Sequence, residues 1–133
     1  MSYGVAAALQ AAIYYRLAND AGIGVPVFDA LPTGEVPETY VQLGTEEVRD
    51  RGDGSVAAAE HRISVSVVTS AAGFAGAKAR AVAVSDALEG ADLTLGRGTL
   101  VGLWFERARA RRDGAAGRLR RIDLRFRARV EDN

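Results

Sequence analysis

The sequence contains no cysteine and only one histidine among its 133 residues. Without cysteine there can be no disulfide, thiolate metal site or cysteine nucleophile, and a single imidazole cannot build a histidine-rich metal site. No apolar run reaches the roughly 18 residues of a transmembrane helix, and the first residues lack the basic-then-apolar layout of a signal peptide. We therefore expect a cytoplasmic protein with no cofactor, no metal and no membrane partner.

The groups that catalysis needs are also scarce. No Gly-x-Ser-x-Gly segment presents a nucleophilic serine, and a serine triad would have to recruit His61, the only imidazole. We predict that His61 is a surface or interface residue. Glu46 and Glu47 would point to opposite faces of a strand, so they could not share a substrate. Residues 96–98 (Gly-Arg-Gly) lack the Lys-Ser/Thr and the helix start of a phosphate-binding loop. These absences predict a protein that is not an enzyme.

The remaining composition is that of an ordinary globular domain, with 48% apolar and 26% charged residues. The length suits one hydrophobic core, so we expect a single domain over residues 1–133. Apolar spacing predicts one helix over residues 3–20, with Ser2 as its N-cap, and another over residues 73–88. Period-two patterns and turn residues predict strands at residues 25–30, 40–44, 62–67, 99–111 and 118–130.

The order helix, three strands, helix, two strands points to an α+β domain. We expect a mainly antiparallel or mixed sheet of about five strands with both helices on one face. In the last strand Ile122, Leu124 and Phe126 belong to an apolar row that should face the helices, while the intervening charged residues face away. The opposite face of the sheet is therefore expected to be polar.

Charge is unevenly distributed along the chain, although 17 basic and 17 acidic residues give a net charge of zero. Residues 1–96 carry 6 basic and 12 acidic side chains, whereas residues 97–133 carry 11 basic and 5 acidic ones. All the basic residues of the second segment are arginine, which makes bidentate contacts with carboxylate and phosphate. This polarity suits a phosphate partner or a head-to-tail contact with another copy.

A row of arginines on the last two strands is the strongest candidate for a binding surface. Two-residue spacing places its members on one face: Arg107, Arg109, Arg111, Arg121, Arg125, Arg127 and Arg129. We add Arg49, Arg51 and Asp53, around a polar loop, to this candidate interface. A solvated face that discourages edge aggregation explains the row equally well. Because the row has no interleaved aromatic residues, a protein partner is favoured over nucleic acid.

Three segments, in this order and spacing, carry a family resemblance. They are residues 8–44, which end in Tyr-Val-Gln-Leu-Gly, the strand-to-helix segment at residues 65–78, and the closing hairpin at residues 112–131. Together they resemble the tail terminator, or tail-completion, family of long-tailed phages and of alphaproteobacterial gene transfer agents. The gene transfer agent version is the most similar.

The resemblance implies a structural protein: a ring, expected to be a hexamer, that caps the head-proximal end of the tail tube. Such a ring stops tube polymerisation and offers a surface for attachment of the head. The implied partners are further copies of the chain, the tail tube protein and the head–tail connector or stopper of the neck, with DNA passing through the lumen without specific binding. The protein would assemble in the cytoplasm and end at the tail–neck junction of the particle. The alternatives are a neck or head–tail stopper protein and, less favoured, a nucleic-acid-binding protein.

Overall fold

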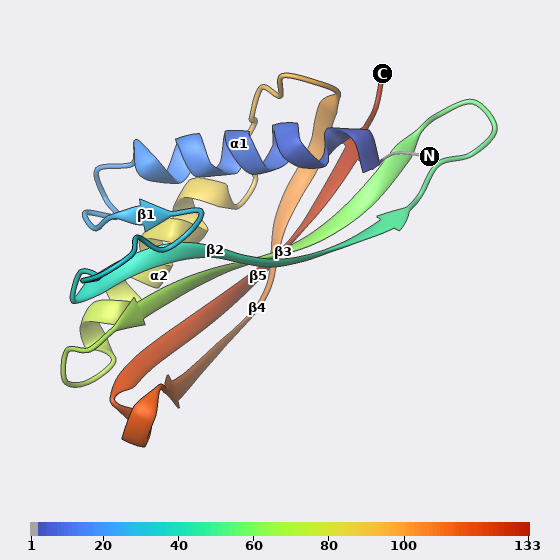
Figure 1. The fold of residues 1–133 in the computed structure, drawn as a ribbon. Coiled ribbons are helices and arrows are strands. Elements are labelled where there is room, and N and C mark those ends of the chain that lie inside the picture. The colour runs from blue at the N-terminus through green and yellow to red at the C-terminus, as the bar shows by residue number, and fades with distance from the viewer. Residues whose placement is uncertain (1–2) are drawn as a thin grey trace.

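The predicted helices and strands form in the predicted order (Figure 1). The computed structural model describes residues 3–133, so the N-cap predicted at Ser2 lies outside the described residues. The helices are α1 (Ala6–Ala18), which follows the 3-10 turn η1 (Tyr3–Val5), and α2 (Ala75–Leu88). The strands are β1 (Val27–Phe28), β2 (Thr39–Asp50), β3 (Ala58–Thr69), β4 (Thr99–Asp113) and β5 (Leu119–Glu131). The 3-10 turn η2 (Ala115–Gly117) closes the β4–β5 hairpin.

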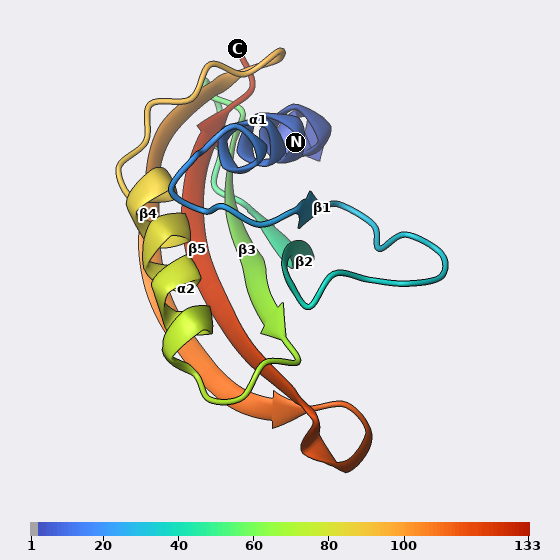
Figure 2. The same ribbon diagram turned by 90° about the vertical axis from the view of Figure 1, so that its left-hand side faces the viewer.

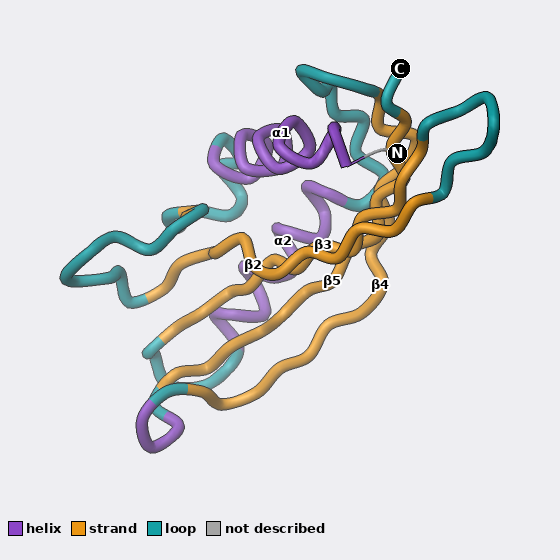
Figure 3. The backbone as a smooth tube through the Cα atoms, turned by 45° about the vertical axis from the view of Figure 1, so that its right-hand side comes forward, coloured by secondary structure: helices purple, strands orange, loops and turns teal. Residues whose placement is uncertain are grey.

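All five strands belong to one mixed sheet with the spatial order β1-β2-β3-β5-β4. β1 pairs in parallel with β2, and the other neighbouring strands pair antiparallel. Figure 3 shows β2, β3, β5 and β4 side by side. β5, the last strand in sequence, therefore lies between β3 and β4. β1 and β4 form the two opposite edges of the sheet, and β1 is very short. The predicted α+β class is confirmed.

Both helices lie on the same face of the sheet and leave the other face open. Figure 2 shows α2 lying across β4 and β5, with α1 seen end-on. Burial along β5 alternates residue by residue, because strand side chains point alternately to the two faces. The apolar row of β5 is buried against the helices, as predicted, and consists of Ile122, Leu124, Phe126, Ala128 and Val130.

The core lies between the helices and this sheet face. α1 contributes Leu9, Ile13 and Leu17, which recur at helical spacing and are at most 2% exposed. α2 contributes mainly small side chains, such as Ala77 and Ala81, so its backbone lies close to the sheet. None of the described helices is long and apolar enough to span a membrane.

The strands differ from prediction mainly in length. β2 and β3 extend well past the predicted residues 40–44 and 62–67 as a twisted ribbon. The outer half of β2 is polar and mostly exposed, so no apolar alternation marks it as strand in the sequence. A bulge between Leu43 and Glu46 also interrupts its period. Helix α1 ends at Ala18, before the predicted boundary at residue 20.

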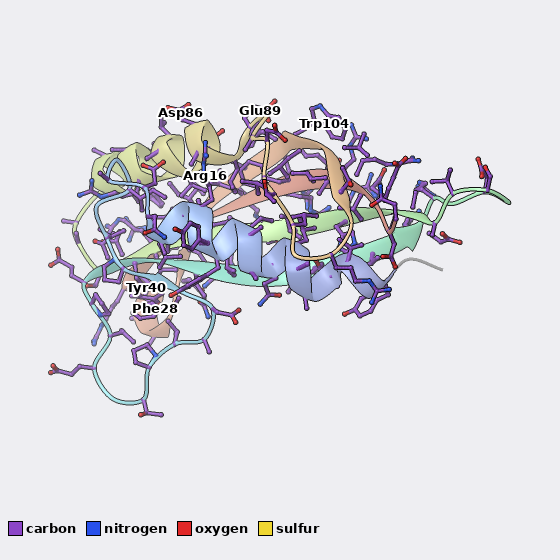
Figure 4. All side chains as sticks on the ribbon, turned by 90° about the horizontal axis from the view of Figure 1, so that it is seen from above. Arg16, Phe28, Tyr40, Asp86, Glu89 and Trp104 are labelled. Atoms are coloured by element: carbon purple, nitrogen blue, oxygen red, sulfur yellow. The ribbon has the colours of Figure 1, made fainter. Side chains whose placement is uncertain are left out.

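Two segments project from the body of the molecule. One is the β2–β3 loop at residues 51–57, and the other is the connector at residues 29–38 between β1 and β2 (Figure 4). The connector contains no helix or strand, and eight of its residues in sequence, 29–36, are exposed. Both segments lie away from the core and are free of its packing constraints.

Candidate interaction surface

The open face of the sheet carries the seven arginines of the predicted row. Antiparallel pairing places Arg107 opposite Arg125 and Arg111 opposite Arg121. Cross-strand neighbours of like charge destabilise a sheet unless opposite charges or solvent compensate them. The face therefore depends on the carboxylates that lie among the arginines.

Asp123 is the central carboxylate of this face. It accepts hydrogen bonds from Ser66 Oγ at 2.5 Å, Arg121 Nε at 2.9 Å and Arg111 Nε at 3.3 Å. Burial raises the pKa of Asp123, but the Ser66 hydroxyl and the guanidinium groups of Arg121 and Arg111 outweigh burial and hold the pKa below its ordinary value. Asp123 is thus ionised at neutral pH and fixes the positions of two arginines.

Glu60 organises the arginines at the other end of the face. Its side chain is 11% exposed and lies 3.1 Å from Arg62 Nη1, 3.7 Å from Arg127 Nη1 and 3.9 Å from Arg51 Nε. Arg62 also pairs with Glu106 at 3.4 Å. At this end of the face Arg51, Arg62 and Arg127 already have a carboxylate partner within the chain.

Trp104, labelled in Figure 4, lies on the arginine face, so the expectation that this face lacks aromatic residues is wrong. It lies opposite Arg127 in the β4–β5 pairing, and the Arg127 guanidinium is 4.6 Å from the centre of its ring. The physical reason is a bulge between Phe105 and Arg107, which inserts one residue and reverses the face of the preceding β4 residues. Strict alternation from Arg107 would have turned Trp104 toward the helices.

Four arginines of the row make no ion pair with any residue of the described range 3–133: Arg107, Arg109, Arg125 and Arg129. Three of them line an open cavity of about 470 Å³ on this face. Its wall also includes Asp123, which Arg111 and Arg121 neutralise, and three hydroxyl-bearing residues from neighbouring strands: Thr45, Ser64 and Ser66. Guanidinium and hydroxyl groups together donate hydrogen bonds to carboxylate or phosphate oxygens. The cavity is the part of the face best suited to bind an anionic group from outside the chain.

The other three predicted site residues lie apart from this cavity. Arg49 pairs with Glu47 at 3.1 Å, and Arg51 pairs with Glu60. Asp53 accepts hydrogen bonds within its own loop, from Ser55 N at 2.8 Å, Ser55 Oγ at 2.9 Å and Val56 N at 3.0 Å, and these bonds lower its pKa. Asp53 thus shapes the β2–β3 loop, and the structure does not bring the ten candidate residues into one site.

His61 is not a surface residue, contrary to the sequence-based prediction. Its side chain is fully buried on the helix side of β3, and its Nδ1 lies 3.0 Å from Glu46 Oε2. The β2 bulge explains this pair, because it sets Glu46 on the helix side beside Ile63. Glu47 lies opposite Arg62 on the open face, so the opposite-face prediction for the two glutamates is confirmed. Among residues 3–133 no cluster of His, Cys, Asp and Glu could hold a metal ion.

The two charge segments of the sequence do not form two poles of the molecule. Because β5 inserts between β3 and β4, arginines of the C-terminal segment contact acidic residues of the N-terminal one, as in the Arg127–Glu60 pair. A contact in the reverse direction joins Arg62 to Glu106. The net charges of the two segments are therefore partly neutralised within the sheet, and the unpaired arginines are the charges left for a partner.

Comparison with known proteins matches nearly the whole chain. The family model described as Tail completion protein gp17 matches residues 11–131. Among solved structures, a chain of one described as "Virion of native gene transfer agent (GTA) particle" is 58% identical to this chain. The match covers 98% of this chain and 99% of that chain, with a TM-score of 0.92. No curated protein sequence matches.

Proposed function

The chain belongs to the family described as Tail completion protein gp17, and from this membership we propose that it closes the head-proximal end of a phage-like tail tube. The observation that carries the proposal is the match itself, which spans residues 11–131 and therefore most of α1, all of α2 and the whole sheet. A protein of this family is a structural component of a tail.

The particle is proposed to be a gene transfer agent. The support is the chain of a native gene transfer agent virion that is 58% identical and shares the fold over its whole length. In this proposal the protein is made in the cytoplasm and stays in the finished particle where tail and neck meet. Its partners are other copies of itself, the tail tube protein and the connector or stopper protein of the neck.

Capping follows from surface complementarity and needs no chemistry. A tube grows because its exposed end binds the next tube subunit, so a ring that covers this end stops growth. The ring, proposed to be a hexamer, presents to the neck a face that differs from a tube end. Its lumen leaves a passage for DNA and requires no specific DNA contact.

The open sheet face is proposed as the main contact surface of the ring. Arg107, Arg109 and Arg125 have no carboxylate partner among the described residues. Asp123 holds Arg111 and Arg121 in place, and Glu60 pairs with Arg127. The unpaired guanidinium groups can bind carboxylates from outside the chain in bidentate geometry. This arrangement favours recognition of an acidic protein surface.

Purified tail tube protein that polymerises in solution provides the test. The proposal predicts that far less than one copy of this chain per tube subunit arrests elongation, and that gold-labelled antibody against the chain marks one end of each tube. Elongation that proceeds unchanged, with no label at tube ends, would contradict capping. Label at the end of finished tails combined with unchanged elongation would assign the protein to the neck.

A further inference from the structure

The connector at residues 29–38 is an exposed acidic arm, for which the sequence patterns predict no role. It carries Asp29, Glu35 and Glu38 and no basic residue. Gln10 donates a hydrogen bond to Asp29 at 2.6 Å, whereas Glu35 and Glu38 make no ion pair with any residue from 3 to 133. The arm thus displays uncompensated carboxylates at the β1–β2 side of the molecule.

The same arm exposes two aliphatic side chains. Leu31 is 39% and Val36 is 44% exposed, and each directly precedes a proline, at positions 32 and 37. A residue before proline is held in extended backbone, which lowers the entropy lost when the arm binds. Acidic and apolar side chains on a partly preorganised segment are suited to a surface that is both basic and apolar.

Such a surface lies at the opposite edge of the sheet, along β4. Arg107 and Arg109 are exposed on its open side and pair with no carboxylate of residues 3–133. On its helix side an apolar groove lies between β4 and α2, lined among others by Phe105, Ala108 and Val82. Phe105 is 41% exposed, and the outer edge of β4 pairs with no described strand. The β4 edge therefore offers guanidinium groups on one side and apolar contact on the other.

We infer that the connector at residues 29–38 of one copy docks on the β4 edge of the next copy, with Glu35 and Glu38 toward Arg107 and Arg109 and the aliphatic residues toward the groove. The arm and the edge are complementary in charge and in apolar surface, and their positions in the sheet suit a contact between copies. Because the sheet order is β1-β2-β3-β5-β4, the arm and its receptor lie at opposite edges and cannot meet within one copy. A head-to-tail contact of this kind forms a closed ring when its rotation closes. This inference rests on the proposed function and names the subunit contact of the ring.

Charge reversal tests the contact in a producing strain that lacks the gene. One variant reverses the arm (Glu35→Arg with Glu38→Arg), and the other reverses the edge (Arg107→Glu with Arg109→Glu). Each variant alone brings like charges together at every contact, so we expect its yield of particles with tails of normal length to fall by about tenfold or more. When both are expressed together, each arm can meet an edge of opposite charge in the other variant, and yield recovers.

Cross-linking tests proximity directly, because the native chain has no cysteine. Particles are made with a chain carrying Glu35→Cys and Arg109→Cys and treated with a short bis-maleimide. We expect a ladder of covalent multimers on a denaturing gel. A matched chain carrying Asp86→Cys and Arg109→Cys, with Asp86 exposed on α2, should give no ladder.

If the edge variant lowers the particle yield and the arm variant does not, the inference is overturned and the arginines are assigned to contact with the tube or with DNA. Failure of the two reversed variants to restore yield together, without cross-links in intact particles, would overturn it as well. If the intact particles without cross-links have tails of normal length, the capping function still stands and only the proposed subunit contact is excluded. Circular dichroism of the isolated variants controls for folding, since both sets of positions are exposed.

Discussion

Replacement of Asp123 by asparagine removes the charge that holds the centre of the open face. The asparagine keeps the size of the side chain but loses the charge that Arg111 and Arg121 bind. Hydrogen bonds to charged groups contribute about 1.5–3 kcal/mol each at most, and the Asp123 side chain is 28% exposed, which weakens them. We therefore expect Asp123→Asn to lower the free energy of unfolding by about 1–2 kcal/mol at neutral pH.

The direction in which this loss of stability changes with pH follows from the pKa of Asp123. The pKa of Asp123 is lowered in the folded protein, so its stabilisation is fully present above the unfolded pKa of about 3.9. The stabilisation is lost as pH falls through the lower folded value. The difference between native chain and Asp123→Asn should therefore be constant from about pH 7 to about pH 5 and shrink below about pH 4.

Urea denaturation followed by tryptophan fluorescence measures both effects. Asp113→Asn is the matched control, because the Asp113 carboxylate is more exposed and lies 3.6 Å from Arg111 and 3.9 Å from Arg121. We expect the control to cost less than about 0.5 kcal/mol. Equal stability of Asp123→Asn and the native chain, or a loss that persists unchanged in acid, would refute the view that Asp123 organises the face.

Three other replacements test the core, the open face and the buried pair of the helix side. Phe126→Ala, in the fully buried centre of β5, should cost about 3–5 kcal/mol in urea denaturation, and a cost under about 1 kcal/mol would contradict its place in the core. Arg127→Gln should change the fluorescence of Trp104, the only tryptophan, and cost about 0.5–1 kcal/mol; an unchanged spectrum would argue against the stacking. Glu46→Ala leaves the buried His61 without its partner and should cost about 1–3 kcal/mol by thermal or urea unfolding, whereas a neutral effect would contradict the pair.

Much of the fold follows from local sequence patterns. The period-two row of β5 from Ile122 to Val130 predicts both the strand and its buried face, because one face packs on helices and the other does not. The spacing of Leu9, Ile13 and Leu17 likewise predicts α1. These patterns are clear in the sequence because each element buries only one of its faces, and the residues on that face must be apolar.

Two of the errors arise at bulges, one in β2 and one in β4. An inserted residue reverses the face of every residue beyond it. Alternation counted from Arg107 therefore assigns Trp104 to the wrong face of the sheet. The bulge before Glu46 likewise puts this glutamate on the helix side, where alternation from Leu43 does not place it, so its pairing with His61 is not predicted. The β2 bulge contains Gly44, a residue type that often marks a bulge inside a strand, whereas the β4 bulge between Phe105 and Arg107 contains neither glycine nor proline. In the charged stretch of β4 a single inserted residue leaves too weak a sequence signal to be read.

The candidate surface was only partly predictable for a different reason. Spacing alone places the arginines on one face, but which of them are free depends on long-range contacts such as Arg127 with Glu60. The acidic arm at residues 29–38 and its distance from the β4 edge likewise depend on strand order, and β5 inserts between strands that precede it in sequence. Topology, more than local pattern, thus decides which surfaces can meet between copies.

The length of the tail tubes in a strain that lacks this gene tests the central claim most directly. Electron microscopy of lysates from the deletion strain should show tubes much longer than those of the parent strain and without heads. Supply of the native chain from a second locus should restore a uniform length. Tubes of normal length, whether detached from heads or in intact particles that still transfer DNA, would contradict the claim that this protein terminates the tail.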